Sequence, residues 1–125
     1  MQSMLTMIIV SDMDRSVRFY RDTLGLRLRF QSPDWTEFEV GGTTLALHSG
    51  GKPAPLSPEK EAVAGRASIG FNVDNLDKTF EELKAKGARV VMPPMEREGE
   101  GIRLAVFLDP DGLNISFAQS APRKG

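Results

Sequence analysis

The 125-residue chain repeats one pattern of elements, and this repeat constrains its fold more than any other feature. In the first half a strand-like run leads to Asp12, a residue suited to a helix N-terminus, and an apolar stripe with helical spacing then runs up to Gly25. Asn75 and a second helical stripe repeat this pattern in the other half, at one constant offset along the chain. A later strand begins at Gly42 in the first half and at Gly112 in the second. The sequence therefore predicts one module used twice.

Each module is expected to contain a strand, a helix and then three strands. The first is predicted to have strands at 4–10, 26–31, 35–40 and 43–49 and a helix at 13–24; the second, strands at 66–73, 88–92, 102–108 and 113–119 and a helix at 76–86. Two helices are too few to flank a parallel sheet on both sides, so an α+β fold with antiparallel strands is expected.

The chain is predicted to be one domain overall, with modules at residues 1–49 and 66–119, a linker at 50–65 and a tail at 120–125. The linker is rich in Gly and Pro and is either a flexible join or a flap over a site. The mostly apolar strand 4–10 is predicted to be covered on both faces. The charged segment 95–101 is predicted to be a mobile loop.

Charge and composition exclude several classes of function. There are 16 basic and 17 acidic residues, a net charge of -1 and no basic cluster, so we expect no nucleic-acid partner. The apolar N-terminal run is too short to span a bilayer and lacks a basic leader, so we expect no membrane insertion and a cytoplasmic location. The chain has no cysteine and one histidine, which removes thiolate chemistry and limits metal ligation.

Two motifs carry a resemblance to a known family. Phe19-Tyr20 is followed by Leu24-Gly25, and the turn Asp109-Pro110-Asp111-Gly112 precedes the last strand. With the repeated order of elements, they make the chain resemble the vicinal oxygen chelate superfamily, which includes glyoxalase I, fosfomycin and bleomycin resistance proteins and extradiol dioxygenases. The resemblance covers residues 4–119. It implies two βαβββ modules whose mixed β-sheet curves into a partly closed cavity, and it implies a homodimer.

The resemblance also implies where a metal would be held. Glyoxalase-like members place His, Gln or Glu ligands on the first and last strands of each module, and the matching positions are Leu5, Ala46, Ser68 and Ser116. The repeat relates these four in two pairs, Leu5 with Ser68 and Ala46 with Ser116. None offers the imidazole, carboxylate or thiolate that a divalent transition metal prefers. We therefore expect no metal and no other cofactor.

Three larger side chains are candidates for contacts to a small-molecule ligand. His48 follows Ala46 by two residues and so shares its strand face; it could bind a ligand, act as a general acid or base, or be a solvated strand-end residue. Trp35 could stack on a planar ligand, fill the core or contact a partner chain. Arg103 could pair with a carboxylate or phosphate if it points inward, or could face solvent.

The remaining candidates are smaller or apolar. Ser68 and Ser116 could offer hydroxyl groups to a ligand, or could be small residues that keep a cavity open. Met7, Phe38 and Phe107 could line an apolar pocket or belong to the ordinary core.

The leading interpretation is a metal-free homodimer, similar to bleomycin resistance proteins, that binds a small, mostly apolar molecule in the barrel cavity. The balanced charge argues against a strongly cationic ligand. The alternative is a metal-dependent lyase, isomerase or dioxygenase resembling glyoxalase I. A third possibility is metal-free acid–base catalysis by His48, so whether the chain is an enzyme stays open from the sequence.

Overall fold

The computed structural model describes residues 1–53, 67–97 and 101–120. The chain divides into two units, Met1–Pro55 and Leu56–Gly125, and their boundary falls inside the predicted linker. Most of that linker, and the predicted tail beyond Ser120, lie outside the described residues. None of the described helices is long and apolar enough to cross a membrane.

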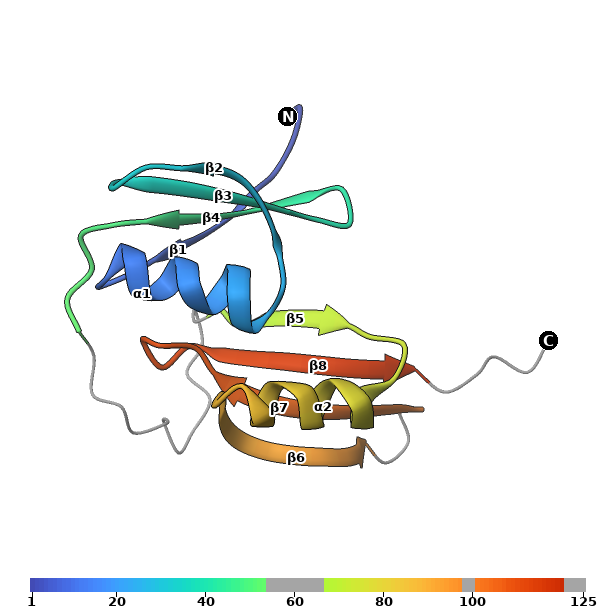
Figure 1. Cartoon of the computed structure of the whole chain (residues 1–125). Coiled ribbons are helices and arrows are strands. Elements are labelled where there is room, and N and C mark those ends of the chain that lie inside the picture. Colours follow the sequence, from blue (N-terminus) through green and yellow to red (C-terminus); the bar gives the residue numbers. More distant parts are fainter. Residues whose placement is uncertain (54–66, 98–100, 121–125) are drawn as a thin grey trace. The chain divides into compact units, whose positions relative to one another are not determined.

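Unit 1 is a four-stranded sheet with a helix on one face (Figure 1). Its elements are β1 (Thr6–Ile9), α1 (Met13–Arg18), a π-helical turn η1 (Phe19–Thr23), β2 (Arg27–Gln31), β3 (Trp35–Val40) and β4 (Thr43–His48). The strand order is β1-β4-β3-β2, with β1 parallel to β4 and the other neighbours antiparallel. The sheet is therefore mixed, because β4 returns beside β1 and runs in the same direction.

The first helix changes its geometry halfway along. Asp12 caps it, since its Oδ1 accepts a hydrogen bond from the Arg15 backbone N–H at 3.0 Å. Beyond Arg18 the turn widens, and the Leu24 N–H donates to the Phe19 carbonyl, five residues back, at 2.9 Å. Gly25 has φ 73°, which turns the chain out of the helix. The predicted helix at 13–24 is thus correct in extent, but its second half is π-helical.

Unit 2 repeats this arrangement. Its elements are β5 (Ile69–Asn72), α2 (Leu76–Ala85), β6 (Arg89–Arg97), β7 (Ile102–Leu108) and β8 (Asn114–Ser120). The strand order is β5-β8-β7-β6, and β5 is parallel to β8. Asn75 caps α2 as Asp12 caps α1, since its Oδ1 accepts from the Lys78 N–H at 3.1 Å.

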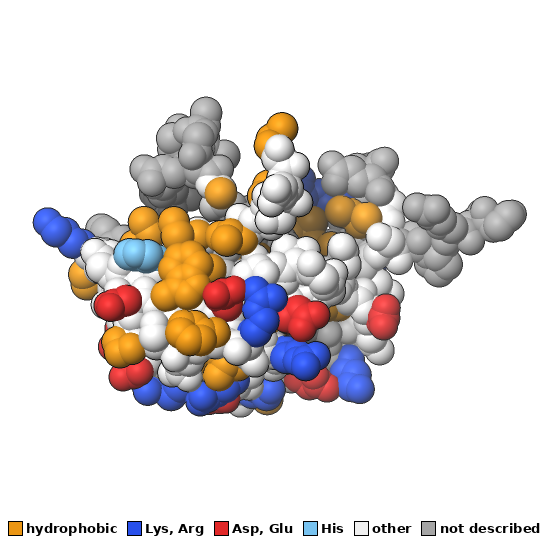
Figure 2. Space-filling model, turned by 90° about the horizontal axis from the view of Figure 1, so that it is seen from above, with side chains coloured by type: hydrophobic (Ala, Val, Ile, Leu, Met, Phe, Trp, Pro, Cys, Tyr) orange, Lys and Arg blue, Asp and Glu red, His pale blue; other side chains and the backbone are white. Residues whose placement is uncertain are grey.

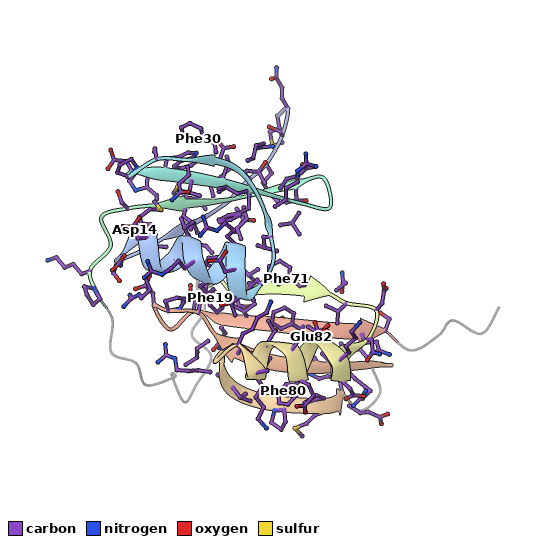
Figure 3. The ribbon with its side chains drawn as sticks, in the orientation of Figure 1. Asp14, Phe19, Phe30, Phe71, Phe80 and Glu82 are labelled. Atoms are coloured by element: carbon purple, nitrogen blue, oxygen red, sulfur yellow. The ribbon has the colours of Figure 1, made fainter. Side chains whose placement is uncertain are left out.

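Aromatic side chains form the core of unit 2 between α2 and the sheet; two of them, Phe71 and Phe80, are labelled in Figure 3. Phe80 of α2 lies 5.5 Å from Phe107, centroid to centroid, and Phe107 lies 5.8 Å from Phe117 in an edge-to-face contact. Phe71 stacks on Phe117 at 5.5 Å. These four rings come from the helix and three different strands, so they fasten the helix to its sheet.

The strand β6 is longer than predicted. The prediction ends it at residue 92 because two prolines follow, and assigns 95–101 to a loop; instead the strand continues through Pro93 and Pro94 to Arg97, and 98–100 lie outside the described residues. Its pairing with β7 is irregular between Val90 and Met92 and again between Met92 and Met95. Because β6 is the edge strand, the irregular segment disturbs pairing with β7 alone, where Ala105 has no partner in β6.

The strand registers bear out the internal repeat. Met7 is paired with Ala46 in unit 1, and Gly70 is paired with Ser116 in unit 2. These two pairs are related by the same offsets that the sequence predicts for the first and last strands of the modules. The same backbone frame is therefore used twice, with different side chains at equivalent positions.

Candidate functional site

Strand alternation gives the sheet of unit 1 two different faces. Thr36 and Phe38 are fully buried beneath α1, and the Thr36 hydroxyl donates to the Met13 sulfur at 3.3 Å. The intervening residues Trp35 and Glu37 lie on the opposite side of the sheet. We call that side the open face of unit 1; it carries Met7, Ile9, Arg29, Phe30, Trp35, Glu37, Thr44, Ala46 and His48.

Large apolar side chains are exposed on this open face. The exposed fractions are 49% for Met7, 59% for Ile9 and 51% for Phe30. Figure 3 shows Phe30 on the side of the sheet away from α1, and Figure 2 shows hydrophobic side chains gathered beside the chain's one histidine. The prediction that the first strand is covered on both faces is wrong for unit 1, because Met7 and Ile9 alternate with residues that face the helix. Exposed apolar side chains grouped in this way mark a binding surface more often than scattered ones.

A hydrogen-bond network crosses the same face. The Arg29 guanidinium donates from Nη2 to Glu37 Oε1 at 2.6 Å and to the Thr44 hydroxyl at 2.8 Å. Glu37 also accepts from the Trp35 indole, with Nε1 3.1 Å from Oε2. The hydrogen bond from Arg29, followed by that from Trp35, lowers the pKa of the Glu37 carboxyl from its ordinary value. The network holds the carboxylate charged and orients the plane of the indole.

His48 stands next to this indole. The two rings meet edge to face, with centroids 6.0 Å apart and planes at 82°. His48 Nδ1 lies 2.6 Å from the Ser49 carbonyl oxygen, and the side chain is exposed. His48 and Ala46 lie on one face, as their spacing predicts, but Ala46 is completely buried.

The corresponding open face of unit 2 is built from smaller side chains. Ser116 is paired with Gly70 on one side and with Val106 on the other. A Cβ at Gly70 would come within 2.9 Å of the Ser116 hydroxyl oxygen, so this hydroxyl lies over the glycine. Ser68 is exposed and immediately precedes β5.

The structure does not bring Arg103, Phe38 and Phe107 to the open faces. Arg103 lies on the α2 side of β7, where both of its terminal nitrogens contact the Asp77 carboxylate at 3.1 Å. Phe38 and Phe107 are 0% and 1% exposed and pack beneath the helices. Strand alternation separates all three from the serine and histidine candidates, so they are not part of the open-face site. For the two phenylalanines this is the ordinary-core alternative that the sequence left open.

The residues present do not fit a transition-metal site. Within residues 1–53, 67–97 and 101–120 there is no group of three or more His, Asp or Glu side chains able to hold a metal ion. Of the four positions that the resemblance singles out, Leu5 and Ala46 carry no donor atom, and Ser116 offers a neutral hydroxyl. Glu37, the carboxylate nearest to Trp35 on the open face of unit 1, already accepts from two donors.

Sequence reasoning missed Arg29 and Glu37 as parts of the site. The available signal was the spacing of two residues between Trp35 and Glu37, which places both on one strand face. Arg29 gave no such signal, because the irregular register between Leu28 and Phe30 directs it.

A separate hollow of about 390 Å³ lies at the start of α2, and it is open and polar. It is lined by Asn72, Val73, Asp74, Asn75, Lys78, Thr79 and Glu82. It shares no residue with the candidate site and offers little apolar surface to a ligand.

Comparison with known proteins identifies relatives of the whole chain. A family model described as Glyoxalase/Bleomycin resistance protein/Dioxygenase superfamily matches residues 4–117. The uncharacterized protein YraH of Bacillus subtilis is 32% identical, over 83% of this chain and 87% of its own length. The lactoylglutathione lyase of Haemophilus influenzae is 29% identical, over 99% of this chain and 96% of its own. The crystal structure of SMU.1112c has the same fold, with a TM-score of 0.81, 23% identity and coverage of 94% and 98%.

Proposed function

Because the chain belongs to the Glyoxalase/Bleomycin resistance protein/Dioxygenase superfamily, we propose that it binds a small, mostly apolar molecule without a metal. The proposed binding surface is the open face of unit 1. The observation that carries this proposal is the combination, on one sheet face, of exposed apolar side chains with an indole held by a hydrogen bond. The open face would form a wall of the cavity that the family resemblance implies.

The apolar part of this face supports binding by burial. Met7, Ile9 and Phe30 each expose about half of their surface, and covering apolar surface contributes roughly 25 cal/mol per Å². Trp35 adds a flat aromatic surface whose orientation is held by Glu37. A ligand would lose little affinity to the ordering of this side chain, because the network orders it beforehand.

The proposal includes no metal because the side chains at the expected ligand positions are poor metal ligands. Lewis-acid catalysis needs three or four protein ligands around the ion, and the positions that would supply them here are Leu5, Ala46, Ser68 and Ser116. Two of these residues have no side-chain donor at all. We derive no catalytic step through a metal.

The second candidate function is a metal-dependent lyase or isomerase. The observation that favours it is the 29% identity to the Haemophilus influenzae lactoylglutathione lyase over nearly the full length of both chains. In that case the ion would be held by residues other than the four positions above, and His48 would be the first ligand to test. A dioxygenase has no separate support beyond the family name.

Titration with divalent metals distinguishes the two functions. We expect nickel, zinc, iron(II) and manganese to bind no more tightly than millimolar in calorimetry, and His48→Ala to leave the traces unchanged. Binding of one ion per chain at micromolar affinity or better, lost in His48→Ala, would instead establish the metal-dependent candidate. Ligand binding is then measured through the fluorescence of Trp35, the only tryptophan in the chain.

The family resemblance also implies pairing of two copies, and we propose a homodimer on that resemblance alone. Light scattering of the full chain in solution gives its mass directly, and we expect twice the mass of one chain. A mass equal to that of a single chain at micromolar concentration would contradict the dimer and leave the ligand proposal standing.

A further inference from the structure

We propose that the ligand is a flat, uncharged molecule with a hydrogen-bond donor, and that this donor is directed at Nε2 of His48. This inference rests on the proposed function, because it names the chemical class of molecule that the open face of unit 1 binds. It is based on three neighbouring features of that face. These are the hydrogen-bonded His48 ring, the oriented Trp35 indole, and the Arg29–Glu37 pair, whose charges neutralise each other.

The first step concerns which nitrogen of His48 carries the proton. Nδ1 lies 2.6 Å from the Ser49 carbonyl oxygen, and a carbonyl can only accept. Nδ1 therefore donates, and the neutral ring has its lone pair on Nε2. Across the described part of the chain, Nδ1 to Ser49 is the one hydrogen bond of this ring. On this exposed side chain, Nε2 is the acceptor that remains for a ligand.

The second step concerns charge. Arg29 and Glu37 neutralise each other at 2.6 Å, and each makes a further hydrogen bond to a neighbouring side chain. A charged ligand would have to compete with these contacts for its counter-ion, whereas an uncharged ligand leaves them intact. The neutral face therefore favours an uncharged ligand.

The third step concerns shape. The Trp35 indole cannot turn freely without losing its bond to Glu37, and His48 meets it edge to face at 82°. An aromatic ring of a ligand can pack against these two rings with the offset or edge-to-face geometry that aromatic groups prefer. A flat molecule with a phenolic hydroxyl meets all three conditions.

The tautomer is tested first, by ¹⁵N NMR of the imidazole in a series of alkaline buffers, so that the neutral ring is observed directly. The chain has a single histidine, so the two ring signals need no assignment to a residue. We expect a protonated Nδ1 and an unprotonated Nε2. A ring protonated at Nε2 instead would overturn the proposal.

The ligand class is tested with three probes that share a methyl-substituted benzene ring: p-cresol, 4-methylanisole and toluene. Only p-cresol donates a hydrogen bond. We expect it to bind about fivefold more tightly than the other two in chemical-shift titrations, the ratio that corresponds to a net hydrogen-bond contribution of about 1 kcal/mol.

Two variants of the exposed His48 side chain complete the test. His48→Phe keeps an aromatic ring but has no acceptor, so the preference for p-cresol should disappear while toluene still binds. His48→Gln keeps an acceptor oxygen and should retain part of the preference. Equal binding of all three probes to the wild-type chain would overturn the donor inference and leave the proposed function intact. Failure of all three probes to bind would overturn both.

Discussion

The open faces of the two units share one backbone frame but differ in chemistry. Trp35 is paired with His48 in unit 1, and the equivalent pair in unit 2 is Leu104 with Ala118. Val106 of unit 2 occupies the position that is equivalent to Glu37 of unit 1. Unit 1 thus carries an aromatic and hydrogen-bonding surface, whereas unit 2 carries aliphatic and small residues. The two units share their strand order, and the candidate binding chemistry lies on only one of them.

Each unit also has an Arg–carboxylate pair, but on different faces. Arg29 and Glu37 lie on the open face and orient Trp35. Arg103 and Asp77 join β7 to the first turn of α2 on the covered side of the sheet. The same kind of ion pair lies on the proposed binding surface in one unit and joins a helix to the sheet in the other.

The largest expected effects test whether the helix-covered cores of the two units contribute equally to stability. Phe38 and Phe107 are equivalent buried positions, and each is paired with a buried residue of the neighbouring strand, Leu45 or Ile115. Phe38→Ala and Phe107→Ala should each lower the free energy of unfolding by about 3–5 kcal/mol in urea titrations, because each leaves a cavity beneath its helix.

The control for this pair is Phe30→Ala, at a position that is 51% exposed, which should cost about 1 kcal/mol or less. A Phe107→Ala variant as stable as this control would show that the two cores are not equivalent.

The next effect tests whether ligand binding belongs to unit 1. Trp35→Ala should weaken p-cresol binding about tenfold, equal to about 1.4 kcal/mol, because the flat surface beside His48 is lost. Leu104→Ala, at the equivalent position of unit 2, should change the affinity less than twofold. Chemical-shift titrations of both variants give the comparison, and a larger effect for Leu104→Ala would transfer the site to the other unit.

Some of the features that these variants test could be predicted from the sequence, and others could not. The repeat established which strands are equivalent, because apolar residues recur at constant offsets, and the registers confirm it. Phe38 alternates with Glu37 and Glu39, which favours its burial. Whether Phe107 lies in the core or lines a pocket stayed open from the sequence, because apolar residues occur on both faces of its strand. Alternation then gives no sign of which face the helix covers.

Local irregularities limited the prediction of the site itself. The bulge at Arg29 and the continuation of β6 through Pro93 both change which way side chains point, and neither has a signature in the residue pattern. The polar network on the open face of unit 1 depends on the bulge at Arg29 and not on the repeat. His48 and Trp35 were found because their spacing lies within regular strands.

A smaller effect tests the packing of small residues in unit 2. Gly70→Ala removes backbone freedom from the unfolded chain but brings its Cβ to 2.9 Å from the Ser116 hydroxyl. Alone it should change the free energy of unfolding by less than about 0.5 kcal/mol. In a Ser116→Ala background it should stabilise by about 0.5–1 kcal/mol. Additive values in this double-mutant cycle would show that the hydroxyl does not constrain Gly70.

The smallest expected effect, a change in melting temperature with pH, distinguishes the Arg103–Asp77 pair from the Arg29–Glu37 pair. Hydrogen bonding to Arg103 lowers the pKa of Asp77 from its ordinary value of 3.8. The pair therefore stabilises the fold above that value, and the contribution is lost as the pH falls through the folded-state pKa. Asp77→Asn should lower the melting temperature slightly at pH 7 and progressively less as the pH falls below the ordinary pKa of an Asp carboxyl, with less effect in high salt because the pair is exposed. Glu37→Gln should show the same sign and should also weaken p-cresol binding, which Asp77→Asn should not.

The two adjacent prolines of β6 have a consequence for the behaviour of the chain in a crowded cell. An edge strand normally presents backbone N–H groups that can recruit a strand from another molecule and start aggregation. Pro93 and Pro94 have no N–H group, and they interrupt the middle of the edge that β6 forms. Their neighbours Val91 and Met95 are exposed and apolar, at 42% and 53%, which is the composition that favours strand addition. The prolines therefore hinder the pairing of this apolar edge strand with a strand of another molecule.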